Sequence, residues 1–306
     1  TTDEIGEVLY TYTLFRYAMY LQRRTQYLMK WGTHGTHAYI ETKRDELEKL
    51  LNDGIEGGRL DGEHATLRLQ EIDVPAWYSS VDYHVEKGGY WQDDLDGPSY
   101  DFGSRIHWAG LHDMGEVHEW KTSNLPRHDY RRVIDVGCGT GDSTFGMVNA
   151  FPQARMTGVD IAGPMVKWAF RRAEAQGLAI DFAQENAENF SFADNSFDLV
   201  TATLLFHEMP VEAATRVLSE FHRICEPGGD LAIFTVSVPP NAYGQFMADW
   251  HAHVNIEPYM ADFFREDLEG LARDAGFQDV STKLIGVDPK APRVGGWRLI
   301  SGKKVA

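Results

Sequence analysis

The sequence has few cysteines and no long apolar run. Its 306 residues include two cysteines, Cys138 and Cys225, without the spacing of a metal-binding motif, so we expect two reduced thiols. No stretch approaches the ~20 consecutive apolar residues of a membrane span. The first residues also lack a basic segment followed by an apolar core, as a secretion signal would have. We therefore expect a cytoplasmic protein with no membrane partner.

Positive charge is scarce as well. The chain has 29 Lys and Arg against 46 Asp and Glu, which gives a formal net charge of −17. Proteins that contact nucleic-acid phosphates carry clustered Lys and Arg, so no nucleic-acid partner is expected. A metal site needs three or four convergent ligands, and pairs such as His34 and His37 or His107 and His112 do not supply them. We expect no metal.

What the chain does contain is a large apolar fraction. Apolar residues make up 43% of it, and its 306 residues exceed the ~100–200 usual for one domain. From residue 131 onward, short apolar runs alternate with helical patterns, which predicts a mostly parallel sheet covered by helices on both faces. The apolar runs are residues 133–136, 156–160, 180–184, 197–203 and 230–236, and the helical patterns are 141–150, 163–176 and 211–225.

Residues 1–125 show a different pattern. Apolar residues recur at helical spacing over 3–30, and further helices are predicted around 42–52 and 62–72. A polar segment containing Pro126 then leads into the sheet region. The sequence thus predicts an N-terminal, mostly helical cap over residues 1–125, for substrate binding or dimerisation, and a sheet domain over residues 126–306.

A glycine-rich turn follows the first predicted strand. Residues 133–141 read V-I-D-V-G-C-G-T-G, with Asp135 before Gly137, Gly139 and Gly141. Glycines let the chain turn sharply and let a ligand approach the backbone. The spacing is not the G-x-G-x-x-G of dinucleotide sites. A carboxylate at Asp135 would repel a pyrophosphate but suits an ammonium and a sulfonium, as in S-adenosylmethionine (SAM).

Four further segments follow in a fixed order. They are T-G-V-D-I-A-G-P-M, I-D-F-A-Q-E-N-A-E-N-F-S-F, S-F-D-L-V-T-A-T-L-L-F-H-E-M-P and I-C-E-P-G-G-D-L-A-I-F. With the glycine turn, this order resembles the class I SAM-dependent methyltransferases, especially the branch that includes the ubiquinone and menaquinone C-methyltransferases. The resemblance implies an α/β fold with a Rossmann-like, seven-stranded sheet, closed by an antiparallel hairpin made from residues 275–280 and 297–304.

The same resemblance assigns cofactor-binding residues. Asp160 ends the second strand of this region, where an acid in Rossmann-like sheets hydrogen-bonds ribose hydroxyls. Ile161 and Met165 would flank the adenine. Asn186 replaces the family's aspartate, and its side-chain carbonyl can still accept a hydrogen bond from the adenine amino group. We add three neighbours to the set, which are Ala187, Glu188 and Thr203.

The acceptor side is expected between the cap and the strand ends. Residues 77–108 interleave Tyr, Trp, His and Asp, and can be read either as ordinary packing or as an acceptor site. Tyr100 resembles the tyrosine that closes over the methionine end of the cofactor in ubiquinone-type enzymes, so we assign it to both catalysis and cofactor binding. His207 is a candidate general base, although it can also simply pack at a helix start. The expected substrate-contacting residues are Tyr83, Tyr90, Arg105, Trp108, His207 and Glu208.

The functional hypothesis is methyl transfer from SAM to a small polar metabolite, leaving S-adenosylhomocysteine (SAH). Our first choice is methylation of sulfur or nitrogen, for example in a thioether acid or amino acid that becomes a sulfonium. One alternative is O- or C-methylation of a small aromatic with His207 as base, and another is a non-catalytic protein that binds SAM or SAH. The partners expected are the small-molecule acceptor and a second copy of the chain, bound through the N-terminal segment.

Overall fold

The computed structural model describes residues 1–107, 118, 120–237, 240–286 and 296–305. Within these residues the helices are α1 (Thr2–Leu9), α2 (Thr13–Trp31), α3 (Thr36–Glu41), α4 (Arg44–Asn52), α5 (Ala76–Ser79), η1 (Tyr83–Val85), α6 (Asp96–His107), α8 (Asp142–Ala150), α9 (Gly163–Gln176), η2 (Phe206–Glu208), α10 (Val211–Ile224), α11 (Ala242–Asn255), α12 (Met260–Phe263) and α13 (Leu268–Asp274). The strands are β1 (Arg59–Asp61), β2 (Thr66–Arg68), β3 (Arg132–Val136), β4 (Arg155–Asp160), β5 (Ile180–Gln184), β6 (Phe197–Thr203), β7 (Cys225–Val236), β8 (Gln278–Gly286) and β9 (Trp297–Lys303).

The described strands form one sheet in the order β1-β2-β5-β4-β3-β6-β7-β9-β8. The strands from β2 to β7 in this order are parallel, and β9 runs antiparallel between β7 and β8. The predicted Rossmann-like sheet with its closing hairpin is therefore confirmed. The expected count of seven strands is corrected to nine, because β1 and β2 extend the sheet beyond β5.

Strands β1 and β2 also overturn the helix predicted around residues 62–72. Thr66–Arg68 pairs in parallel with Asp181–Ala183, and the Leu67 side chain is buried in the core. The Glu174 carboxylate accepts hydrogen bonds from three consecutive backbone N–H groups, those of residues 63–65. Pairing with β5 and this carboxylate satisfy the backbone groups, so tertiary contacts outweigh the local helical pattern.

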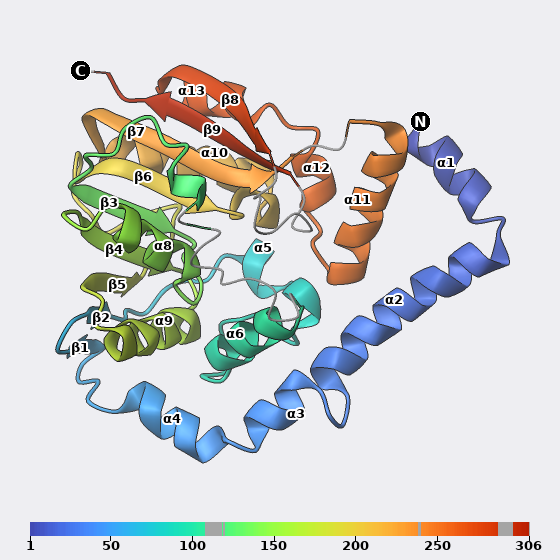
Figure 1. Ribbon diagram of the computed structural model, residues 1–306, viewed down its shortest axis with the longest axis horizontal. Coiled ribbons are helices and arrows are strands. Elements are labelled where there is room, and N and C mark those ends of the chain that lie inside the picture. Colours follow the sequence, from blue (N-terminus) through green and yellow to red (C-terminus); the bar gives the residue numbers. More distant parts are fainter. Residues whose placement is uncertain (108–117, 119, 238–239, 287–295, 306) are drawn as a thin grey trace.

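Helices cover both faces of the sheet, as predicted (Figure 1). On one face α8 and α9 pack through Phe145, Met147, Val166 and Phe170. On the other face α10 and α13 pack through Val217, Leu218, Phe221, Leu268 and Ala272. The central strands are buried on both sides, which explains why they read as continuous apolar runs.

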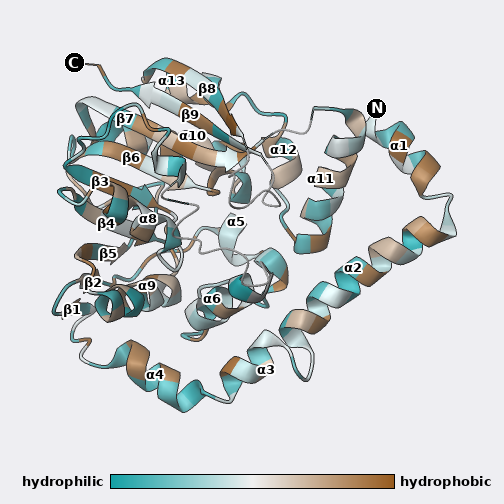
Figure 2. Ribbon diagram, viewed as in Figure 1, coloured by the Kyte–Doolittle hydropathy of each residue, from teal (hydrophilic) through white to brown (hydrophobic). Residues whose placement is uncertain are grey.

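The N-terminal helices run around the outside of the molecule (Figure 1). The single helix expected over residues 3–30 is two helices, α1 and α2, separated at residues 10–12. Rings of Tyr10 and Phe15 pack on Phe246 of α11, each with centroids 6.0 Å from it. Figure 2 shows hydrophobic and hydrophilic residues mixed along α2. Among the described helices, none is both long enough and apolar enough to cross a membrane.

Candidate functional site

The site begins at the turn between β3 and α8. Gly137, Gly139 and Gly141 have φ angles of 70°, 53° and 94°, in the left-handed region that favours glycine. A Cβ on Gly137 would lie 2.9 Å from Leu205 Cδ1, and one on Gly141 would lie 2.7 Å from Phe145 Cζ. A Cβ on Gly139 would meet no described atom within 4 Å. The turn is thus closely packed at its ends and open at Gly139, where a ligand can approach the main chain.

Asp160 at the end of β4 holds this turn in place. Its Oδ2 atom accepts a hydrogen bond from the Gly139 N–H at 2.9 Å, and its Oδ1 atom accepts one from the Ala162 N–H at 2.9 Å. Burial raises the pKa of this carboxyl above its ordinary value, although the N–H donors act in the opposite direction. Met165 is buried and Ile161 is half-buried beside it. Each carboxylate oxygen keeps a lone pair for a ribose hydroxyl.

Asp135 lies deeper than the sequence suggested. The residue is completely buried, and its Oδ2 atom accepts hydrogen bonds from the hydroxyls of Ser143 and Thr144 in the first turn of α8. Burial raises the pKa of the Asp135 carboxyl to about 6. The carboxylate joins the end of β3 to the start of α8, and its direct contact with a cofactor stays a prediction.

The third and fourth strands bring the remaining cofactor candidates to the same edge, because β3, β4, β5 and β6 are parallel neighbours. Asn186 Oδ1 accepts a hydrogen bond from the Glu188 N–H at 2.9 Å. The Glu188 carboxylate accepts one from Trp77 Nε1 at 2.9 Å. Ala187 and Thr203 are half-buried nearby in the chain. The structure thus gathers these residues beyond the strand ends, and their roles toward the cofactor stay predictions.

Tyrosines pack against this edge. Tyr83 and Tyr90 are buried in one cluster with Ala162 and Met165, and Tyr100 packs against that cluster. The rings of Tyr90 and Tyr100 meet edge to face with centroids 5.2 Å apart. Burial raises the pKa of the Tyr100 hydroxyl well above its ordinary value, so this hydroxyl stays protonated at neutral pH. The structure therefore places Tyr83, Tyr90 and Tyr100 together, beside a predicted adenine-flanking residue.

Two other expected substrate residues are Arg105 and Trp108. Arg105 is exposed, and its Nε atom lies 3.0 Å from Asp101 Oδ1 in an ion pair one helical turn away. This pairing does not connect Arg105 to the tyrosines. Trp108 lies outside the described residues.

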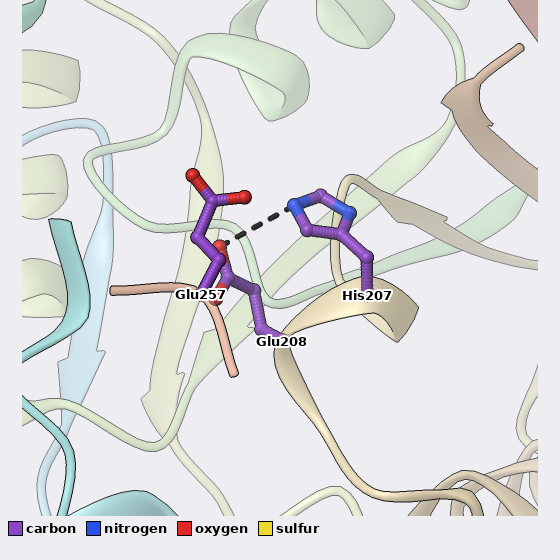
Figure 3. A group of neighbouring side chains, drawn as sticks. All are labelled: His207, Glu208 and Glu257. Atoms are coloured by element: carbon purple, nitrogen blue, oxygen red, sulfur yellow. Dashed lines mark ion pairs between the residues drawn. The ribbon is translucent and has the colours of Figure 1, made fainter. Parts of the chain in front are cut away.

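His207 and Glu208 form part of a larger group, which we name the His–Glu cluster: His84, His207, Glu208, His251 and Glu257. His207 Nε2 lies 3.3 Å from Glu208 Oε1 (Figure 3). His84 Nε2 lies 3.0 Å from Glu208 Oε1, and its Nδ1 atom lies 3.4 Å from Glu257 Oε1. His251 Nε2 lies 3.7 Å from that same Glu257 oxygen. Side chains from η1, η2 and the end of α11 therefore meet at one point.

Contacts within the cluster shift the pKa values of its members. Burial alone would lower the pKa of His84, but the carboxylates of Glu208 and Glu257 outweigh it and raise this pKa to about 10. Burial would raise the pKa of Glu208, but His84 and His207 lower it below its ordinary range. Sequence reasoning found only His207 and Glu208. No spacing signal marks His84, His251 or Glu257, because they lie far away in the chain.

A hollow of about 470 Å³ lies at the other end of the strands. Its lining includes Arg68, Arg132 and Arg155, and Arg132 and Arg155 begin β3 and β4. These arginines are paired with Glu185, Glu226 and Asp181 respectively, so they offer little free charge to an anion. Ligands of open α/β sheets bind at the carboxyl ends of the strands, and we place the site there.

The sheet order and the glycine turn at its carboxyl edge define a Rossmann-like, cofactor-binding protein. Comparison with known proteins gives the family. Residues 133–229 match the family model of a methyltransferase domain. The chain is 31% identical over 206 residues to a ubiquinone/menaquinone biosynthesis C-methyltransferase of Rhizobium meliloti, covering 60% of this chain and 78% of that protein. The chain therefore belongs to the class I SAM-dependent methyltransferases, in the branch of the ubiquinone/menaquinone enzymes.

Other relatives are matched over a smaller share of their length. A demethylmenaquinone methyltransferase of Thermus thermophilus is 35% identical over 115 residues, which are 37% of this chain and 51% of that protein. The chain thus spans about half the length of several curated relatives. SAM is the cofactor of the family, and the open backbone at Gly139 beside Asp160 fits it.

Solved structures support the fold alone. A phosphoethanolamine N-methyltransferase of Haemonchus contortus, solved with SAM, aligns with a TM-score of 0.51 at 15% identity, covering 79% of this chain and 63% of that one. Human N-acetylserotonin methyltransferase, also solved with SAM, aligns with a TM-score of 0.51 at 16% identity, covering 70% and 57%.

Proposed function

We propose that this protein transfers a methyl group from SAM to nitrogen or sulfur of a small polar metabolite. When bound, the cofactor supplies an electrophilic methyl group. The chain's own part is to bind, to orient the acceptor in line with that methyl group and to exclude water, which can accelerate such a displacement without an obligatory base. A tertiary amine or a thioether becomes cationic when it accepts a methyl group.

The observation that supports this proposal is the wall of tyrosine rings next to Met165. Tyr78 and Tyr83 stack with centroids 5.5 Å apart, and Tyr90 and Tyr100 meet edge to face. Aromatic faces attract cations, more strongly when water is excluded. Burial also raises the pKa values of these four hydroxyls, so the wall stays neutral and polar. Such a wall favours a cationic product over an apolar quinone tail.

A second candidate is C- or O-methylation of a small aromatic. The names of the relatives, which are C-methyltransferases of ubiquinone and menaquinone synthesis, favour it. So does the His207–Glu208 pair, in which a carboxylate 3.3 Å from an imidazole would stabilise the imidazolium formed on taking a proton. In this reaction His207 Nδ1, the ring nitrogen that does not face Glu208, would take the proton of a phenol or enol.

Release of SAH distinguishes the two candidates. The protein is incubated with SAM and a panel of thioethers, amines, phenols, quinols and carboxylates, and SAH is measured by mass spectrometry. We expect release with one thioether or amine and none with phenols or quinols. Release only with a phenol or quinol would replace the proposal by the second candidate. Silence across the panel despite tight SAH binding would favour a non-catalytic SAM-binding protein.

We also propose that α1 and α2 form a homodimer interface. Leu14, Tyr17 and Tyr20 of α2 are exposed, Leu14 at 82% of its full accessibility. Helix α2 carries four basic side chains and no acidic one, whereas the whole chain has a net charge of −17. A positive, partly apolar helix is complementary to the acidic surface of a second copy.

Light scattering after size exclusion tests the dimer. We expect the wild-type protein to have twice the mass of one chain and Leu14→Glu to have the mass of one chain. Leu284→Glu is the matched control, because Leu284 is 71% exposed but lies on β8. A wild-type monomer, or a dimer that Leu14→Glu leaves intact, would rule out this interface.

A further inference from the structure

The His–Glu cluster brings metal-ligating atoms together beside the tyrosine wall. One imidazole nitrogen of His207 and one carboxylate oxygen each of Glu208 and Glu257 all lie within 4.8 Å of one another (Figure 3). We propose that His207, Glu208 and Glu257 bind one divalent transition-metal ion of the zinc or manganese type. Imidazole nitrogen with carboxylate oxygen is a donor set that such ions accept.

The distances fit a small coordination sphere. Bonds of about 2.0–2.2 Å to nitrogen and oxygen place neighbouring ligand atoms of a tetrahedral site about 3.3–3.6 Å apart. His207 Nε2 and Glu208 Oε1 are 3.3 Å apart. Glu257 comes from a different segment, after α11, and one of its carboxylate oxygens lies within 4.8 Å of the other two ligand atoms, so its side chain would have to move closer to reach the same spacing. Three protein ligands leave one position open, as in catalytic rather than structural sites.

Burial explains why a cation is needed here. The side chains of His207 and Glu257 are only 7% and 3% exposed, and Glu208 Oε2 is buried with no hydrogen-bond partner among the described residues. A buried carboxylate beside a half-buried one destabilises the fold unless positive charge compensates them. The neighbouring His84 supplies at most one positive charge against these two carboxylates, so a negative charge remains uncompensated and attracts a cation.

Further imidazoles surround the carboxylates. His84 contacts both, Glu208 at 3.0 Å and Glu257 at 3.4 Å, and His251 lies 3.7 Å from Glu257. Carboxylates that bind metals are themselves held by hydrogen bonds, and these outer contacts fix their orientation. We therefore assign His84 and His251 as positioning residues of the site.

Backbone strain is concentrated at the same place. Six described non-glycine residues have positive φ, and four of them lie in the cluster or within three residues of a member: His84, Val85, Leu204 and Ile256. Val85 and Ile256 are β-branched, for which positive φ is a marked outlier. Strained backbone of this kind persists where surrounding contacts fix it, often at functional sites. Here the contacts of His84 and Glu257 hold strained backbone in the two segments that carry them.

The open position gives the ion a use in the reaction. It could bind a carboxylate, hydroxyl or thiolate of the acceptor and so orient it toward the methyl donor. This use rests on the proposed function. Binding of the ion does not, and it is measured without any acceptor.

Titration with Co²⁺ alone tests the site. Protein dialysed against a chelator is titrated while the d–d absorption bands of the ion are recorded, and Zn²⁺ is then added to displace it. We expect one Co²⁺ per chain. Glu257→Gln should weaken binding at least 100-fold, and His84→Gln should weaken it roughly 10–100-fold. Glu63→Gln is the matched control, since Glu63 lies 4.0 Å from His64 in an exposed pair, and it should bind as wild type does.

SAH affinity, measured for every variant, reports folding independently of the ion. If Glu257→Gln fails to bind SAH, Glu208→Gln replaces it as the ligand variant. The proposal is overturned if the wild-type protein takes up no stoichiometric ion. It is equally overturned if ligand variants that still bind SAH take up Co²⁺ as tightly as the control does.

Discussion

The backbone N–H of Gly139 donates a hydrogen bond to Oδ2 of Asp160 across 2.9 Å. One residue lies in the turn after β3 and the other at the end of β4, so two neighbouring strands are connected where the cofactor is expected. The same carboxylate that we assign to the ribose also fixes the shape of the glycine turn. We therefore expect cofactor affinity to depend on Asp160 both through a contact with the ribose and through the shape of the turn.

Replacement of Asp160 by alanine should weaken SAH binding by roughly 1–3 kcal/mol, because a charge-assisted hydrogen bond and the support of the turn are both lost. Isothermal titration with SAH measures this. Asp181→Ala is the matched control, since Asp181 lies at the start of β5 and pairs with Arg155 away from the carboxyl edge. Equal affinities of the Asp160 variant and the wild-type protein would remove Asp160 from the cofactor site.

Gly139→Ala should lower SAH affinity at least tenfold, because the new Cβ would occupy the open space beside the turn. The positive φ also costs about 1 kcal/mol of stability for a residue with a side chain. Gly228→Ala separates the two effects: Gly228 has φ of 85° and open surroundings, but it lies in β7. Both variants should lose similar stability in thermal unfolding, and only Gly139→Ala should lose SAH affinity.

Tyr100→Phe should reduce kcat about 2–10-fold with little change in melting temperature, since one hydroxyl near the reacting groups is lost while the ring packing on Tyr90 stays. Steady-state kinetics with the acceptor found in the panel, beside thermal unfolding, give both numbers. Tyr39→Phe, at an exposed tyrosine, serves as control. An unchanged kcat for Tyr100→Phe would mean that its hydroxyl has no part in the reaction.

Stability should depend on pH through Asp96. Burial raises the pKa of this carboxyl to about 7, and an unfolded aspartate titrates near 3.9, so the folded state holds the proton over the range between. The contribution of Asp96 to stability is therefore greatest at acidic pH and is lost as pH rises through about 4 to 7. Asp96→Asn stays neutral throughout and should exceed the wild-type stability by roughly 1–2 kcal/mol at pH 8.

Thermal unfolding from pH 5 to pH 8 checks this prediction. The advantage of Asp96→Asn in melting temperature should grow with pH and level off above pH 7. Asp93→Asn is the contrasting variant, because the hydrogen bond from Arg44 lowers the pKa of Asp93 and charge at that position stabilises the fold. A constant difference between Asp96→Asn and the wild-type protein would show that this carboxyl titrates normally.

The sheet domain could be predicted from sequence because its signals are local. The glycine turn, Asp160 at a strand end and the apolar runs of β3 to β7 are each encoded within a few residues. Parallel pairing of the strands then brings their carboxyl ends to the same edge of the sheet. The helix predicted over Thr66–Arg68 is wrong because the conformation of this segment depends on pairing with β5, more than a hundred residues later. Local propensity does not carry that information.

The His–Glu cluster shows the same limit more strongly. Its members come from η1, η2 and the segment around α11, and only the folded chain brings His84 and Glu257 to within 3.4 Å. The tyrosines could be predicted from the sequence, because Tyr83, Tyr90 and Tyr100 lie in one short segment rich in aromatic residues. Asp135 lies in β3 just before the glycine turn, but its burial and its hydrogen bond from Ser143 depend on how α8 packs.

Strand β2, from the first part of the chain, covers one edge of the parallel sheet. Without Thr66–Arg68 alongside it, β5 would be the outermost strand, with a row of unpaired N–H and C=O groups open to any other chain. The N-terminal segment therefore protects the β5 edge of the sheet by pairing with it. A fragment starting at residue 126 would retain the glycine turn but would expose the unpaired edge of β5. Such fragments would associate through this edge.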